Sequence, residues 1–248
     1  MKTVYYAEID STNEEAKRRF AAGEAEPLLI CANMQTAGKG RNGRSFYSPE
    51  NTGIYFSLLY PCKDSKMLEE SIFVTTAAAV AVCSAIRKTT GADAGIKWVN
   101  DVYVSGRKVC GILAEAAFRQ SGTIQELGII VGIGINLTTK DFPKEISDVA
   151  SGIGDFTGDE LQEMKEAILN DVGNALCDYF KNPTDHKRIL EEYRNLSIVL
   201  GKEVSFSRQG ESLTRGVAKD VLEDGSLVVV CEDGEHILNS GEIHLLMH

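Results

Sequence analysis

The sequence predicts an α/β protein in which a mixed sheet with helices is followed by a small β-barrel. Strand-like and helix-like segments are interspersed as far as residue 198, which is typical of an α/β domain. From residue 199 the chain consists of short β-like segments separated by turn residues, which is typical of a small barrel. We therefore predict a larger domain at residues 1–198 and a barrel domain at residues 199–248.

The composition limits the partners and the compartment. With 36 acidic and 26 basic side chains the net charge is −10, so the long-range field repels nucleic acids and acidic membranes. The six cysteines are scattered without a Cys-x-x-Cys pair, which predicts reduced thiols in a cytoplasmic protein. The N-terminus has no apolar signal core, and no apolar run approaches the about 20 residues that span a bilayer. The four histidines are dispersed, so the sequence assigns no metal-ligand residues and no Ser-His-Asp triad.

The first elements are a strand over Val4–Ile9 and a helix that begins in the segment Asp10-Ser11-Thr12-Asn13 and ends at about Ala22. The helix start has two interpretations. Thr12 and Glu15 have the spacing of a capping box, which predicts a helix cap. The hydroxyl and amide groups there also suit a polar ligand, and the two interpretations are compatible.

Two buried strands, Pro27–Met34 and Gly53–Tyr60, enclose the basic loop Gln35–Pro49. Its glycines and cations alternate, as Gly38, Lys39, Gly40, Arg41, Gly43 and Arg44. Glycines let backbone N–H groups turn inward at positive φ, and arginine offers a planar charged fork for phosphate or carboxylate. The loop lacks the Walker spacing, and a strand rather than a helix follows its near-GxGxxG segment. It therefore predicts an anion site, with a solvated basic hairpin or a nucleic-acid contact as the alternative.

An alanine-rich segment, Met67–Thr90, predicts a core helix because it has no glycine or proline and is apolar on most faces. Residues 138–157 are predicted to be irregular. Two further helices are predicted at Asp159–Phe180 and Thr184–Asn195, and the turn signals of the following barrel include Gly210.

The segment Ile96–Glu115 predicts two strands joined by a turn at Ser105-Gly106. Its polar residues, which such a hairpin can project towards one cavity, are Lys97, Asn100, Asp101 and Lys108. The alternative is a surface hairpin with ordinary charges. Trp98 is predicted to lie in the core.

Next, Ile124–Ile135 predicts a largely apolar central strand that ends at Asn136. Gly132 and Gly134 weaken a strand, so their presence indicates the close approach of a ligand or of another backbone. Asn136 is then placed at a strand end, where ligands are commonly bound.

Taken together, these segments resemble the biotin protein ligases, the biotin–[acetyl-CoA-carboxylase] ligases. The matching motifs occur in the family's order as DSTN (Asp10–Asn13), QTAGKGRNGRSF (Gln35–Phe46), KWVND (Lys97–Asp101), RKVCGILAE (Arg107–Glu115) and GIGIN (Gly132–Asn136). The resemblance implies a catalytic domain similar to class II aminoacyl-tRNA synthetases and an SH3-like C-terminal barrel. Because DSTN begins at Asp10, it also implies the type without an N-terminal DNA-binding domain.

The resemblance implies a two-step reaction. The carboxylate of biotin attacks Mg-ATP to give biotinyl-5′-AMP, and a lysine of a biotin carboxyl carrier protein then takes the biotinyl group. ATP and Mg²⁺ are thus expected, with biotin as substrate. A cytoplasmic location follows from the composition, and a homodimer is compatible with the sequence. The alternatives are a lipoate–protein ligase of the same fold and a nucleic-acid-binding module, which the net charge disfavours.

Residue roles also follow from the resemblance. The residues expected to bind biotin are Ser11, Thr12, Asn13, Gln35, Lys39, Gly40, Arg41 and Lys108. Those expected to bind ATP are Arg41, Arg44, Phe46, Asn100 and Asn136, with Phe46 packing against adenine. Those expected to act in catalysis are Arg41, Lys108 and Asp101, the last by orienting or helping to deprotonate the carrier lysine.

The chain departs from the family pattern at three positions. Lys39 replaces an arginine, which changes little if that position contacts the ligand through its backbone. Phe46 replaces a tryptophan and offers adenine a smaller aromatic face. Val99 replaces the proline of the usual KWPND, which frees φ and restores an N–H near Asn100 and Asp101.

Overall fold

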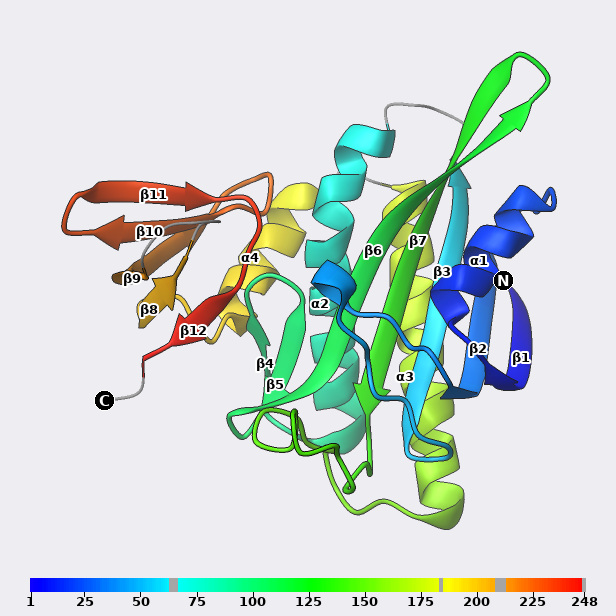
Figure 1. Cartoon of the computed structure of the whole chain (residues 1–248), viewed down its shortest axis with the longest axis horizontal. Helices are drawn as coiled ribbons and strands as arrows, with labels where there is room; N and C mark the ends of the chain where they lie inside the picture. Colours follow the sequence, from blue (N-terminus) through cyan, green and yellow to red (C-terminus); the bar gives the residue numbers. More distant parts are fainter. Residues whose placement is uncertain (63–66, 183–184, 208–212, 247–248) are drawn as a thin grey trace.

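The computed structural model describes residues 1–62, 67–182, 185–207 and 213–246, and it builds the larger part of the chain around a seven-stranded sheet. The sheet is mixed, because β1 and β2 pair in parallel and the other neighbours pair antiparallel in the order β1-β2-β3-β7-β6-β5-β4 (Figure 1). Its strands are β1 (Lys2–Ile9), β2 (Leu28–Gln35), β3 (Gly53–Cys62), β4 (Ala94–Lys97), β5 (Asp101–Val104), β6 (Arg107–Ser121) and β7 (Ile124–Asn136).

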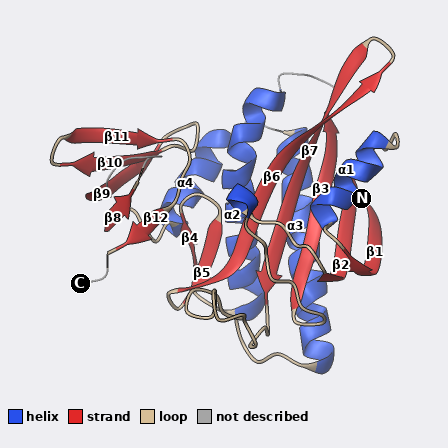
Figure 2. Ribbon diagram, viewed as in Figure 1, coloured by secondary structure: helices blue, strands red, loops and turns tan. Residues whose placement is uncertain are grey.

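Helices cover the two faces of this sheet unequally (Figure 2). The large core lies between one face and the helices α2 (Met67–Thr90), α3 (Gly158–Lys181) and α4 (His186–Leu196). On the opposite face α1 (Thr12–Ala21) packs through Ala16 and Phe20 in a smaller apolar cluster. Successive strand residues point to opposite faces, so the rest of this second face is free to carry polar groups.

The predicted mixed α/β fold is confirmed, and outside residues 96–115 the predicted strands and helices of the described ranges occur with small differences at their ends. Residues 138–157 contain no named helix or strand, as expected. The predicted helix start at Thr184 and the turn signal at Gly210 lie outside the described residues.

One prediction about strands was wrong. The segment 96–115 holds parts of three strands rather than two, because the chain turns between β4 and β5, where Lys97 pairs with Asp101. Trp98 leaves the strand there and is buried in the core as expected, with 4% of its surface exposed. Its indole N–H donates a 2.9 Å hydrogen bond to the carbonyl of Gly225, and the Trp98–Val99 peptide bond is cis. A buried tryptophan needs a hydrogen-bond acceptor for its indole N–H. Trp98 finds that acceptor outside the sheet, and the strand ends there although the apolar sequence pattern continues.

The C-terminal part forms a second, antiparallel sheet in the order β11-β10-β9-β8-β12. The strands are β8 (Glu203–Phe206), β9 (Thr214–Val221), β10 (Leu227–Cys231), β11 (Gly234–Leu238) and β12 (Ile243–Leu245). Across the described ranges no pairing joins β11 to β12, so the sheet is consistent with the expected barrel but not closed. Arg194 of α4 holds Asp220 of β9 in an ion pair of 2.7 Å, which ties this sheet to the helices.

None of the helices in the described ranges combines the length and the apolar character that crossing a membrane requires.

Candidate active site

Three glycines, Gly111, Gly132 and Gly134, lie close together on the face of the sheet that α1 only partly covers, and we call them the glycine floor. Gly111 of β6 pairs with Gly134 of β7, and Gly132 lies two residues before Gly134 on the same face. A Cβ on Gly132 would lie 2.0 Å from Oδ1 of Asn13, and one on Gly134 would lie 2.3 Å from the ring of Phe46. A close approach does occur at these glycines, but it is made by the side chains of Asn13 and Phe46 rather than by the expected ligand or backbone.

A buried polar cluster lies beside this floor. Ser11, Thr12 and Asn13 are each less than 5% exposed. The backbone N–H and the hydroxyl of Thr12 both donate to Oε1 of Gln35, at 2.9 and 3.1 Å. The hydroxyl of Ser57 lies 2.7 Å from Oγ1 of Thr12 and 2.5 Å from Oδ1 of Asn13. The segments around DSTN and Gln35, which are distant in sequence, thus meet in one hydrogen-bonded group.

The capping-box interpretation was wrong. Ser11 occupies the N-cap position, but no side chain caps this end of α1. The hydroxyl of Thr12 contacts Gln35 and Ser57, whereas the carboxylate of Glu15 pairs with Arg18 and Arg19. Side chains on neighbouring strands, one an acceptor and one a donor, have replaced the local contact that the sequence spacing favoured.

Three members of this polar group were not identified from the sequence. Ser57 is fully buried in β3, Ser48 accepts a 2.9 Å hydrogen bond from Nε2 of Gln35, and Glu115 accepts one of 2.8 Å from Nδ2 of Asn13. The signal for Ser57 was its position as a small polar residue within an apolar strand. A buried hydroxyl needs a partner, and here the partners come from elsewhere in the chain.

The basic loop folds as a compact hairpin over the glycine floor. The N–H of Phe46 donates to Gly38 at 2.8 Å, and the N–H of Gly40 donates to Arg44 at 2.7 Å. Of the three loop glycines Gly43 has the expected positive φ, 73°, whereas Gly38 and Gly40 do not. Gly38 is required for another reason, because a Cβ there would lie 2.4 Å from the carbonyl oxygen of Phe46. Figure 1 shows this loop, between β2 and β3, crossing in front of β7 and β6.

The three cations of the loop have different partners. Lys39 pairs with Glu14 of α1 at 2.6 Å, and Arg44 pairs with Glu242, which precedes β12. Arg41 instead donates a 3.0 Å hydrogen bond to the neutral amide oxygen of Asn100. Because no carboxylate is among its hydrogen-bond partners in the described part of the chain, Arg41 keeps its charge available for an anion.

The strands β5 and β6 add a second cation, Lys108, whose partner Asp101 follows Asn100 in the chain. Nζ of Lys108 lies 2.6 Å from the carboxylate of Asp101, and both side chains are between a fifth and a third exposed. Asn100 is held by a 2.8 Å hydrogen bond from its Nδ2 to the carbonyl of Ile112. Lys97 lies instead against the ring of Tyr103, and burial lowers the pKa of this lysine. Asp101 and Lys108 are thus paired, and Asn100 precedes Asp101, whereas Lys97 contacts the ring of Tyr103. None of the four lines the cavity described below, so the common cavity expected for them is not seen there.

Phe46 and Asn136 complete the set of predicted residues. The ring of Phe46 lies over Gly134 and Gly111, with its edge towards Tyr55 at 6.4 Å between ring centroids. Asn136 is 3% exposed at the end of β7, and among the described residues its Oδ1 has no hydrogen-bond partner. A buried acceptor without a partner is rare, so it favours a donor or cation supplied by a ligand.

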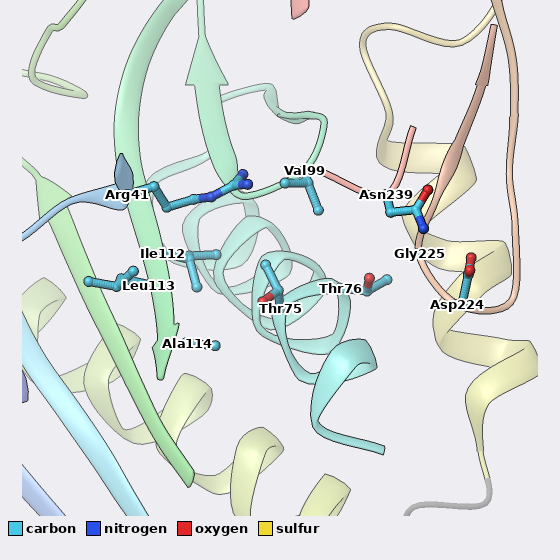
Figure 3. A pocket seen from close by; sticks show the side chains of 10 residues that line it. All are labelled: Arg41, Thr75, Thr76, Val99, Ile112, Leu113, Ala114, Asp224, Gly225 and Asn239. Carbon is cyan, nitrogen blue, oxygen red and sulfur yellow. The ribbon is translucent and has the colours of Figure 1, made fainter. Parts of the chain in front are cut away.

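A cavity of about 180 Å³ lies beside this group, between β6, α2 and the second sheet. Figure 3 shows the side chain of Arg41 at one wall and those of Asp224 and Asn239 at the opposite wall. Of the predicted site residues Arg41 alone lines it, so the cavity adjoins the polar cluster without including it.

Comparison with known proteins places the chain among ligases. Two family models match it, the "Biotin/lipoate A/B protein ligase family" at residues 5–136 and the "Biotin protein ligase C terminal domain" at residues 199–246. The bifunctional ligase/repressor BirA of Bacillus spizizenii is 30% identical over 98% of this chain and 73% of its own length. The biotin–[acetyl-CoA-carboxylase] ligase of Mycobacterium tuberculosis is 25% identical over 96% of this chain and 86% of its own.

The solved structure of the biotin protein ligase of Aquifex aeolicus in complex with biotin and ATP matches the fold along the whole chain. It has a TM-score of 0.76 and 28% identity, and the match covers 100% of this chain and 99% of that one. An apo structure of the same ligase matches with a TM-score of 0.75.

Proposed function

The chain belongs to the biotin/lipoate A/B protein ligase family, and from this membership we propose that it is a biotin protein ligase. It joins biotin to ATP as biotinyl-5′-AMP and transfers the biotinyl group to a lysine of a biotin carboxyl carrier protein. The observation that carries the proposal is the buried polar cluster of Thr12, Asn13, Gln35 and Ser57 next to a basic hairpin on a glycine floor. The match of residues 199–246 to the C-terminal domain of biotin ligases favours biotin over lipoate.

Biotin recognition is assigned to the polar cluster and the loop backbone. A ureido ring has two N–H donors and one carbonyl acceptor, so it needs both kinds of partner in a buried site. Asn13, Gln35 and Ser57 supply them, and Ser11 and Thr12 adjoin them. The backbone of Lys39 and Gly40 would close over the ligand from the loop side.

The first chemical step requires a carboxylate to approach a triphosphate that repels it. Arg41 and Lys108 come from different elements and would hold the two anions together, because fixed cations in a water-poor site need no reorganisation during the reaction. Both would then stabilise the charge that develops on the attacked phosphorus. The hairpin would also shield the labile adenylate from water.

The nucleotide is assigned to Arg44, Phe46, Asn100 and Asn136. Mg²⁺ would accompany the phosphates and neutralise part of their charge. The donors fit such an ion, because Mg²⁺ prefers oxygen ligands and often needs only one or two carboxylates beside the phosphates. Asn136 would supply one such ligand, since its buried oxygen has no hydrogen-bond partner among the described residues.

Asp101 is assigned to the second step. Its carboxylate lies 2.6 Å from Nζ of Lys108. An anion bound to Lys108 would compete for that cation and leave the carboxylate of Asp101 free to attract the ammonium group of the carrier lysine. Asp101 would then orient this lysine or accept its proton. A cytoplasmic location and a homodimer remain predictions.

The function is tested by incubating the protein with ATP and either biotin or lipoate and measuring pyrophosphate release. Release with biotin is expected, and release with lipoate alone would overturn the choice of substrate. Mass spectrometry of a co-expressed carrier domain should then find one biotin adduct on a lysine. Steeply salt-dependent DNA or RNA binding without adenylation would favour the nucleic-acid alternative.

Lys108→Ala should slow adenylate formation by about tenfold to 100-fold, because it removes a charge-assisted contact to the reacting anions and leaves Asp101 without its counter-ion. Single-turnover pyrophosphate release measures this rate directly. Lys108→Arg should recover part of the lost rate, because it restores the positive charge but as a planar guanidinium group instead of an ammonium group. A first step as fast as in the parent protein would remove Lys108 from the mechanism.

A further inference from the structure

A chain of alternating charges links one end of the basic hairpin, at Lys39, to the polar cluster. Nζ of Lys39 lies 2.6 Å from Oε1 of Glu14, and the same oxygen lies 2.8 Å from Nζ of Lys17. Lys17 continues to Oε1 of Glu115 at 2.7 Å, and Oε2 of Glu115 accepts the hydrogen bond from Nδ2 of Asn13. Four ionised side chains thus connect the hairpin to a member of the proposed biotin site.

The other end of the hairpin reaches the same cluster by a second route. The hydroxyl of Ser48 donates a 3.0 Å hydrogen bond to the carbonyl oxygen of Phe46 and accepts one from Gln35. Gln35 in turn accepts from Thr12. Both ends of the hairpin are therefore bound to the first turn of α1, one through charges and one through neutral groups.

We propose that Glu14 and Glu115 are positioning residues that couple closure of the basic hairpin to occupation of the polar cluster. Neither has an assigned role in the reaction, and the inference rests on the proposed function. Biotin bound to Asn13 would restrain Glu115 and, through it, Lys17. Lys17 would in turn hold the carboxylate of Glu14 in place. The hairpin position in which Lys39 contacts Glu14 would then be favoured. Closure that is fixed by biotin in this way lowers the entropy cost of the ATP-binding step.

Two further features support Glu14 rather than a neighbouring acid. It is the carboxylate shared by lysines of two elements, and hydrogen bonds from Lys17 and then from Lys39 lower its pKa. Glu14 also removes Lys39 from competition for the anion, which leaves Arg41 as the loop cation held by a neutral group. In the described part of the chain the next residue, Glu15, pairs with Arg18 and Arg19 of α1 and with Tyr6 of β1, and not with the hairpin.

The test compares the parent protein with Glu14→Gln, Lys39→Met and the double variant. Each single variant should raise the KM for biotin and the rate of adenylate loss by about two- to fivefold, the range of partly exposed ion pairs, with little change in kcat. Biotin should protect the hairpin amides from hydrogen exchange less well in both variants than in the parent. Because Glu14 acts on the hairpin through Lys39, the double variant should be no worse than Glu14→Gln.

Glu15→Gln is the matched control, since it removes an equally ion-paired carboxylate from the same turn of α1 without touching the hairpin. It should leave the KM for biotin and the exchange protection unchanged. About 1 M salt should shrink the difference between Glu14→Gln and the parent, because the Debye length falls to about 3 Å. Additive effects in the double variant, or full protection in Glu14→Gln, would overturn the inference, whereas a parent protein that makes no biotinyl-5′-AMP would overturn the proposed function instead.

Discussion

Arg41→Ala should release the adenylate about 100- to 1,000-fold faster than the parent protein, the loss that follows when a preorganised charge is removed from an active site. Arg41 is the loop cation for which the described structure shows a neutral hydrogen-bond partner, Asn100, whereas Lys39 and Arg44 are paired with carboxylates. Its charge is therefore the one that the acyl phosphate can use. The remaining cations cannot replace it without breaking their own ion pairs.

The measurement is the half-life of labelled adenylate on the protein after rapid removal of free biotin and ATP. Arg188→Ala is a suitable control, because Arg188 is an exposed arginine that pairs with Asp185 and Glu192 at α4. It should retain the label as the parent does. Equal half-lives for Arg41→Ala and the parent would show that another group holds the intermediate.

Gly132→Ala should raise the KM for biotin by about 100-fold or more, because a displacement of about 1 Å in a binding group can cost that much. The new methyl group would lie 2.0 Å from Oδ1 of Asn13, so the side-chain amide of Asn13 has to move away from the sheet. That movement separates Asn13 from Ser57 and opens the polar cluster. Overpacking should also cost about 1–3 kcal/mol of unfolding free energy.

Gly128→Ala separates these two effects. Gly128 lies on the same strand and face, but a methyl group there would meet the ring of Phe20 at 3.2 Å, away from the polar cluster. It should lower the unfolding free energy and leave the KM for biotin near the parent value. The two variants are compared by urea denaturation and by biotin-dependent pyrophosphate release. A similar KM for both would mean that the floor at Gly132 does not position Asn13.

Much of the site could be predicted from sequence because the residues concerned carry a strong local signal. The glycines of the basic hairpin and of β7, and the polar segment at the start of α1, each interrupt a regular pattern. Such interruptions indicate close approach or buried hydrogen bonding. The structure brings these segments together on one face of the sheet, as expected.

The partners of these groups could not be predicted in the same way. Ser57 and Glu115 join Asn13 only because β3 and β6 lie on either side of β7, and that register is a property of the folded sheet. For Thr12 the prediction from the sequence was wrong. Its spacing from Glu15 favoured a capping box, but its hydroxyl bonds Gln35 of a neighbouring strand instead. Trp98 ended a strand for a similar reason, by finding its acceptor in the other sheet.

That last contact gives the protein an optical reporter of its own. Trp98 is the only tryptophan in the chain, it is buried, and its N–H is bonded across the junction to the β9–β10 turn. Any event that parts the two sheets would expose the indole to water and move its fluorescence to longer wavelength. The fluorescence of Trp98 can therefore report, without an attached dye, whether the C-terminal sheet stays packed against the larger sheet during substrate turnover.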